Sequence, residues 1–400
     1  MTAAVGPVQD HPIVNANTAR YFASPELHAD AALPHALVGE YASVLFELAF
    51  ERCGAAMADV SSSVFAQAQC ITGKALPWSA AWHPDLAQIE RLLASPLKGD
   101  VAWNVVAPML VRLGAEGVLT EADIRMEQPQ KLFWGTLQLP EADRVRFQRD
   151  QNRADIHLYV QGEAIANLQA QRDVDGLWHS DLAPSVGIVR LCGHPVPVWT
   201  PADGRGYPHP NNRPGLPDAT AQISPVLDEA GELLTQYAPN FVPWIANGMR
   251  NIVPLDASDG ELISASVEEF PGLTFLSFPN PAVELAETLV HETSHHHFLA
   301  LQRLTPLHDG TDKKQYFSPI KQKGRSIDLT LYAFHAFANA AIYHRNLVRR
   351  RPEYHRLNGR TLDESLERIR VLDSHLAETR ALTEAGVILW KPLSEALFEG

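Results

Sequence analysis

Three kinds of feature are scarce in this sequence, and each scarcity excludes a class of protein. Only 3 cysteines occur among 400 residues, too few for a disulfide framework or a thiolate metal site, so we expect a reducing, cytoplasmic setting. No apolar run approaches the roughly 20 residues that cross a bilayer. The N-terminus also lacks the basic start and apolar stretch of an export signal. We therefore expect a soluble protein without a membrane partner.

Positive charge is scarce as well. Asp and Glu outnumber Lys and Arg by 47 to 33, which gives a formal net charge of -14. General nucleic-acid binding needs a basic surface, so nucleic acid is not an expected partner. The basic residues gather between Arg303 and Arg360. There they either attract an anionic ligand or form an ordinary solvated face.

The composition, with 46% hydrophobic and 20% charged residues, is that of a folded globular protein. Spacing of apolar residues predicts a helical region over 1–125, a mixed strand and loop region over 126–217, and a metal-binding catalytic region over 218–400. Lys131–Leu139 has the pattern of one strand, and the Pro- and Gly-rich stretch Pro201–Pro217 is typical of a loop. The predicted fold class is α+β, largely helical with a small antiparallel sheet.

The 218–400 region shows the clearest periodicity. Its predicted strands are Asn251–Leu255, Leu262–Glu269 and Leu273–Phe278. The helices expected to follow are Pro281–Leu304, Ile327–Arg350 and Leu362–Thr383. Asn280 is the expected N-cap of the first of these helices, and Thr361, which precedes an acidic turn, that of the third.

The decisive segment is the His-Glu-x-x-His motif of His291, Glu292 and His295. Residues four apart share one face of a helix, so the two imidazoles can bind one ion. Glu292 lies roughly 100° around the helix, near enough to take a proton from metal-bound water. Neutral imidazole suits Zn(II) and Fe(II) alike, so the pair predicts a zincin-like metal-binding helix without identifying the metal. The competing interpretation is a surface helix rich in histidine.

A complete site needs a third protein ligand. Asp328, Tyr332 and His335 share one face of the next predicted helix. His335 is the first choice because imidazole is a common ligand and its neighbours are apolar. Asp328, which would complete a two-histidine, one-carboxylate triad, is the second, and His344 is the third. The alternative role for His335 is that of a hydrogen-bonded core histidine.

The segments NIVPL, LSFP and LAETLVHETSHHHF, followed by the loop Tyr316–Arg325, resemble a known family over about Arg250 to Arg350. These are the HExxH-motif proteins found beside ribosomal peptide natural-product clusters, regarded as iron- and 2-oxoglutarate-dependent peptide β-hydroxylases. The family places a histidine seven residues after the loop arginine. This chain has Tyr332 there, and His335 follows one turn later.

The resemblance implies an Fe(II) centre, 2-oxoglutarate as cosubstrate and a ribosomally synthesised precursor peptide as substrate. Arginine can bind the distal carboxylate of 2-oxoglutarate through two hydrogen bonds, so Arg325 is the first candidate for that role and Lys321 the second. Glu292 then orients substrate or ligands instead of acting as a base. The peptide is expected to add to the sheet edge supplied by Leu262–Glu269 or Leu273–Phe278.

Two other functions remain open. A zinc metallopeptidase would use the same histidines, with Glu292 as general base, but the chain lacks the Asn-Glu-x-x-x-Asp and HExxHxxGxxH patterns of such enzymes. A peptide-binding protein without catalysis would use zinc only to hold its helices together. The sequence gives no indication of oligomeric state.

Overall fold

The computed structural model describes residues 14–26, 30–54, 71, 75–200, 214–216, 219–258, 260 and 262–399. The chain forms two compact, discontinuous units. His35–Ile188 make up most of the first, and Gly206–Gly400 make up most of the second, which also includes Pro7–Pro34 and Val189–Val196. The predicted regions were consecutive, whereas these units are interleaved. Most of the predicted loop Pro201–Pro217 lies outside the described residues. The predicted α+β class is confirmed.

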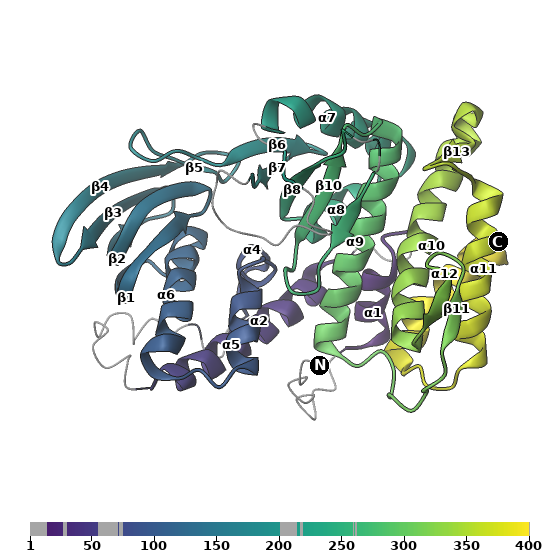
Figure 1. The fold of residues 1–400 in the computed structure, drawn as a ribbon, viewed down its shortest axis with the longest axis horizontal. Helices are drawn as coiled ribbons and strands as arrows, with labels where there is room; N and C mark the ends of the chain where they lie inside the picture. The colour runs from purple at the N-terminus through teal and green to yellow at the C-terminus, as the bar shows by residue number, and fades with distance from the viewer. Residues whose placement is uncertain are drawn as a thin grey trace. The chain divides into compact units, whose positions relative to one another are not determined.

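The first unit joins helices to a five-stranded antiparallel sheet with strand order β1-β2-β3-β4-β5. Its helices are α2 (Ala32–Cys53), α4 (Trp78–Ala81), α5 (Leu86–Ala94) and α6 (Gly99–Glu116). Its strands are β1 (Glu121–Trp134), β2 (Leu137–Arg149), β3 (Arg153–Val160), β4 (Glu163–Arg172) and β5 (Trp178–His179). Helix α6 packs against β1 (Figure 1). The single strand predicted at Lys131–Leu139 is wrong, because the chain turns at Gly135, whose φ of 59° favours glycine.

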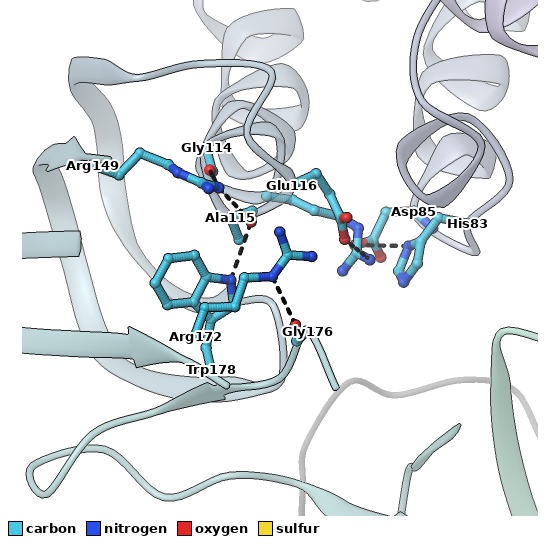
Figure 2. Close-up of polar contacts among 10 residues, drawn as sticks. His83, Asp85, Gly114, Ala115, Glu116, Arg149, Arg172, Gly176 and Trp178 are labelled. Carbon is cyan, nitrogen blue, oxygen red and sulfur yellow. Dashed lines mark hydrogen bonds and ion pairs between the residues drawn. The ribbon is translucent and has the colours of Figure 1, made fainter. Parts of the chain in front are cut away.

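Side chains from the sheet hold the end of α6 (Figure 2). Arg149 Nη1 donates hydrogen bonds to the carbonyl oxygens of Gly114 (2.9 Å) and Ala115 (2.8 Å). Trp178 Nε1 donates to the same Ala115 oxygen at 3.1 Å. The last carbonyls of a helix lack partners within the helix, so these donors satisfy the Ala115 oxygen, whereas the Gly114 oxygen also accepts from the Gly117 amide at 3.0 Å. The contacts fix α6 to the sheet of the first unit.

The second sheet has five strands in the order β6-β7-β8-β10-β9. They are β6 (Gly187–Leu191), β7 (His194–Val198), β8 (Asn251–Asp256), β9 (Ser264–Ser266) and β10 (Leu273–Phe278). Strand β10 pairs in parallel with β8 and antiparallel with β9, so the predicted antiparallel pairing holds for β9 and β10 only. Both β8 and β10 are buried along almost their whole length, which explains their continuous apolar sequences. The short strand β9 is left at the edge.

The second unit also contains most of the helices of the chain. They are α1 (Ala16–Ala23), α7 (Ala219–Tyr237), α8 (Phe241–Gly248), α9 (Ala282–Leu304), α10 (Ile327–Arg350), α11 (Leu362–Glu378) and α12 (Glu384–Phe398), with the short helix η4 (Pro352–Tyr354). Helix α9 packs against α1, α7, α8, α10 and β9, and α9 and α10 stand side by side (Figure 1). Among the described residues, no helix combines the length and the apolar character needed to cross a membrane.

Two small hairpins flank α10. One is β11 (Tyr316–Ser318) with β12 (Lys323–Arg325), and the other is β13 (Arg356–Leu357) with β14 (Arg360–Thr361). The second hairpin leads into α11, whose predicted N-cap, Thr361, is confirmed by a capping box with Glu364. The predicted cap of α9 is wrong, because Pro281 occupies the N-cap position and no side chain caps the helix.

Candidate metal centre

His291 and His295 lie together on α9. Their ring centroids are 4.7 Å apart with the rings nearly perpendicular, and both residues are half-buried. His295 stacks on Tyr332 of α10, with centroids 3.9 Å apart, and His291 meets the ring of Phe337 at 4.6 Å. The i, i+4 spacing therefore produces the predicted juxtaposition, and two aromatic side chains of α10 hold the imidazoles in place.

The electrostatic setting keeps both imidazoles neutral. Burial, with a smaller contribution from the charge of Arg360, lowers the pKa of His291 to about 4. Burial also lowers the pKa of His295, with a second contribution from His291. Neutral histidine is the form that binds metals. The Nδ1 atom of His295 is buried without a hydrogen-bond partner. Both imidazoles are thus in the protonation state that metal binding requires.

Glu292 points toward the sheet edge. Its side chain is buried, and the hydroxyl of Ser266 in β9 donates to Glu292 Oε2 at 2.7 Å and to the Glu292 carbonyl oxygen at 3.0 Å. Ser264 adds a further hydrogen bond to the carboxyl group. Burial raises the pKa of Glu292, although these hydrogen bonds oppose the rise. The motif glutamate therefore ties α9 to the edge strand.

His335 is fully buried, and its Nε2 atom donates to the carbonyl oxygens of Phe22 (3.0 Å) and Ala23 (2.8 Å) in α1. Its other ring nitrogen, Nδ1, is buried without a hydrogen-bond partner. His344 Nε2 likewise bonds the carbonyl of Tyr354 at 3.1 Å, and Asp328 lies half-buried in the first turn of α10. Across the described ranges, no three His, Cys, Asp or Glu side chains form a group able to hold a metal.

His296 and His297 are core residues. His296 accepts a hydrogen bond from the Gly272 amide at its Nδ1 (3.3 Å), and its Nε2 lies 3.0 Å from Thr274 Oγ1. His297 stacks on Trp244 at 4.0 Å and donates through Nε2 to the Trp244 carbonyl oxygen at 2.9 Å. Both rings help to hold α9 in the unit.

The two predicted anion-binding residues lie on the β11–β12 hairpin. Arg325 is half-buried in β12, and its Nε has no hydrogen-bond partner. Lys321 is exposed in the turn. The charge of Arg325 reaches His295, and that of Lys321 reaches His291 and Glu292. A positive side chain attracts a carboxylate most strongly where it is partly shielded from water. The half-buried Arg325 therefore suits an acidic ligand better than the exposed Lys321.

Sequence reasoning missed the β13–β14 hairpin, which packs against α9. It lies near the start of the side of α9 that carries His291 and His295, called here the histidine face. Its turn consists of Asn358 and Gly359, both with positive φ. Asn-Gly between two short extended segments is a strong hairpin pattern, so the sequence did contain the information. The hairpin brings Arg360 within electrostatic range of His291.

No family model matches the chain, and no curated protein matches it.

Proposed function

We propose that this protein is a non-haem iron, 2-oxoglutarate-dependent hydroxylase that adds a hydroxyl group to the β-carbon of a side chain in a ribosomally made precursor peptide. The observation that carries the proposal is the pair of neutral, half-buried imidazoles of His291 and His295, with the basic side chains of Lys321 and Arg325 within electrostatic range. Such a pair suits a divalent ion, and the cations suit an acidic cosubstrate.

In this proposal each side chain has a distinct task. His291 and His295 hold Fe(II), and His335 completes the set through the ring nitrogen that does not bond α1. Arg325, assisted by Lys321, binds the distal carboxylate of 2-oxoglutarate and orients it. When bound, the ion and the 2-oxo acid supply the oxidising chemistry. The rings of Tyr332 and Phe337 fix the two imidazoles and reduce the access of water.

The environment of Glu292 favours the hydroxylase over a hydrolase. A general base must be ionised and free to take a proton. Here burial raises the pKa of the carboxyl group, and Ser266 occupies its Oε2 oxygen. Glu292 is better suited to holding β9 against α9. The peptide would then add to the free edge of β9, which ends the sheet beside the motif.

The zinc metallopeptidase remains the second candidate, and one observation favours it. The motif glutamate lies next to the edge strand, where an extended peptide would bring its main chain close to Glu292. In that case Zn(II) replaces Fe(II) and Glu292 acts as general base. The two candidates predict different products from the same peptide.

The test is the mass change of a precursor peptide encoded beside the gene for this protein. The protein is purified without oxygen and incubated with the peptide, Fe(II), ascorbate and 2-oxoglutarate. We expect one added oxygen atom, complete loss with His291→Ala, and a milder loss with Glu292→Gln. Lys321→Gln should lower the yield of hydroxylated peptide, because Lys321 helps to bind 2-oxoglutarate. Lys323→Gln, on the same hairpin, is its control and should leave the yield unchanged. Shorter fragments that form with Zn(II), and that Glu292→Gln abolishes, would establish the peptidase instead.

A further inference from the structure

The histidine face of α9 ends at a charged cluster that the proposed chemistry does not use. Glu287 lies one helical turn before His291, and His295 lies one turn after it, so the three share a face. Asn358 Nδ2, from the turn of the β13–β14 hairpin, donates to Glu287 Oε2. Arg360 follows two residues later and pairs with Leu357 across the hairpin. The hairpin thereby places a guanidinium group beside the His291 end of the face.

The position of Arg360 is firmly determined. Leu357, its partner across the hairpin, is buried. The next residue, Thr361, is the N-cap of α11 and forms a capping box. A residue held between a buried strand neighbour and a helix cap has little backbone freedom. Its side chain is half-buried, so a ligand can reach it.

The charge of Arg360 is only partly compensated by its neighbours, because it acts at a distance on the Glu287 carboxyl group. Among the described residues Arg360 forms no ion pair or side-chain hydrogen bond, whereas Arg356 of the same hairpin pairs with Glu364 at 3.8 Å. Glu287 is the acid whose pKa the charge of Arg360 lowers, but its carboxyl group is already held by Asn358. Burial raises the pKa of Glu287 to about 7, which weakens its negative charge near neutral pH. Arg360 therefore presents positive charge in a protein whose formal net charge is -14.

Arg325 and Arg360 lie toward opposite ends of the histidine face. Arg325 acts on His295, whereas Arg360 acts on Glu287 and, together with Lys321, on His291. The nine residues from Glu287 to His295 span about 12 Å of helix. Cations at the two ends of such a face suit two separate anionic groups better than one small acid. If Arg325 binds the cosubstrate, Arg360 is left available for a second acid.

We propose that Arg360 binds a carboxylate of the peptide substrate beside His291, so that the protein selects peptides with an acidic side chain next to the modified residue. The identity of the ligand as a peptide rests on the proposed function. Arginine recognises a carboxylate through two parallel hydrogen bonds, which also fixes its orientation. The peptide would thus be positioned by main-chain pairing at β9 and by this charge pair.

The test measures binding alone, on the full-length, metal-free protein. The probes are two labelled pentapeptide pools, blocked at both ends, that differ only in a central Asp or Asn. We expect the Asp pool to bind more tightly, and Arg360→Gln to weaken its binding by about tenfold or more while leaving the Asn pool unchanged. Arg356→Gln, on the same hairpin, is the matched control and should have no effect.

Each other outcome has a clear meaning. Equal binding of the two pools, or an Asp preference that survives Arg360→Gln, overturns the inference. Displacement of the Asp pool by 2-oxoglutarate overturns it too, because Arg360 would then hold the small acid. Arg360-dependent binding without hydroxylation of any precursor peptide would support the inference while removing the hydroxylase proposal.

Discussion

The neighbouring histidines of α9 divide into two pairs with opposite roles. His291 and His295 are half-buried and face α10, whereas His296 and His297 are buried and hydrogen-bonded. Their residue type is the same, so only the rotation of about 100° per residue separates them. The sequence predicted the first pair from its spacing. It gave no sign that α8 and β10 cover the opposite side of the helix, which is what places the second pair in the core.

This division predicts a separation of metal binding from stability. His297→Ala removes a ring stacked on Trp244 and a buried hydrogen bond, so we expect a loss of about 2–4 kcal/mol in unfolding free energy. His291→Ala removes a half-buried ring and should cost less than about 1 kcal/mol, yet abolish metal binding. Thermal unfolding and metal titration of both variants check this. Equal destabilisation by the two substitutions would contradict it.

The role of His335 as third metal ligand can be tested by a single substitution. His335→Gln keeps an amide donor near the carbonyl oxygens of Phe22 and Ala23 but supplies no imidazole. If His335 binds the metal, the affinity for Fe(II) or Zn(II) should fall at least tenfold in a folded variant. His344→Gln is the control, because His344 lies on the same helix as His335 and its Nε2 donates to the carbonyl oxygen of Tyr354. An unchanged affinity in His335→Gln would leave this residue a core histidine.

At the scale of elements, prediction succeeded where one apolar pattern continues without interruption from end to end. The expected helix Ile327–Arg350 and strand Leu273–Phe278 match α10 and β10 in their bounds. Apolar residues repeat along both, so tertiary contacts and local pattern agree. The predicted helix Leu362–Thr383 instead ends at Glu378, and the separate helix α12 was not foreseen.

Prediction failed where a short turn interrupts the pattern. Gly135 and the pair Asn358-Gly359 adopt positive φ and reverse the chain. At Gly135 a side chain would lie 2.8 Å from Trp178, so only glycine fits. The β13–β14 hairpin is too short for any hydrophobic period, and its site residue Arg360 was therefore missed. The contacts of His335 with α1 were equally inaccessible, since they join residues more than 300 positions apart.

Strand β9 is the predicted site at which the precursor peptide pairs with the sheet. Because β9 ends the sheet, its outer backbone groups are available to an added strand. Binding of the precursor peptide should slow amide hydrogen exchange in Ser264–Ser266. Strand β6, at the opposite edge of the same sheet, is the internal control and should not change. Protection of β6 instead, or of neither edge, would contradict peptide addition beside the metal-binding helix.

At the scale of the molecule, the proposed chemistry belongs to one of two compact units. The second unit contains α9, α10 and both small hairpins. It also takes its N-terminal helix α1 from the far end of the sequence, through the bond from Trp244 Nε1 to the Tyr21 carbonyl oxygen (3.1 Å) and the bonds from His335. The first unit supplies none of the proposed ligands. Metal binding should therefore stabilise the two units unequally.

Hydrogen exchange of the full-length protein can measure this inequality. A ligand present at a hundred times its dissociation constant adds about 2.7 kcal/mol to the stability of the structure that binds it. We expect metal to slow exchange in α9 and α10 and to leave β1–β4 of the first unit unchanged, because those strands contain no proposed ligand. His291→Ala should remove the effect, whereas Lys323→Gln should preserve it. Equal protection of both units would mean that the metal binds elsewhere or that the units unfold together, and an effect that survives His291→Ala would exclude this histidine as a ligand.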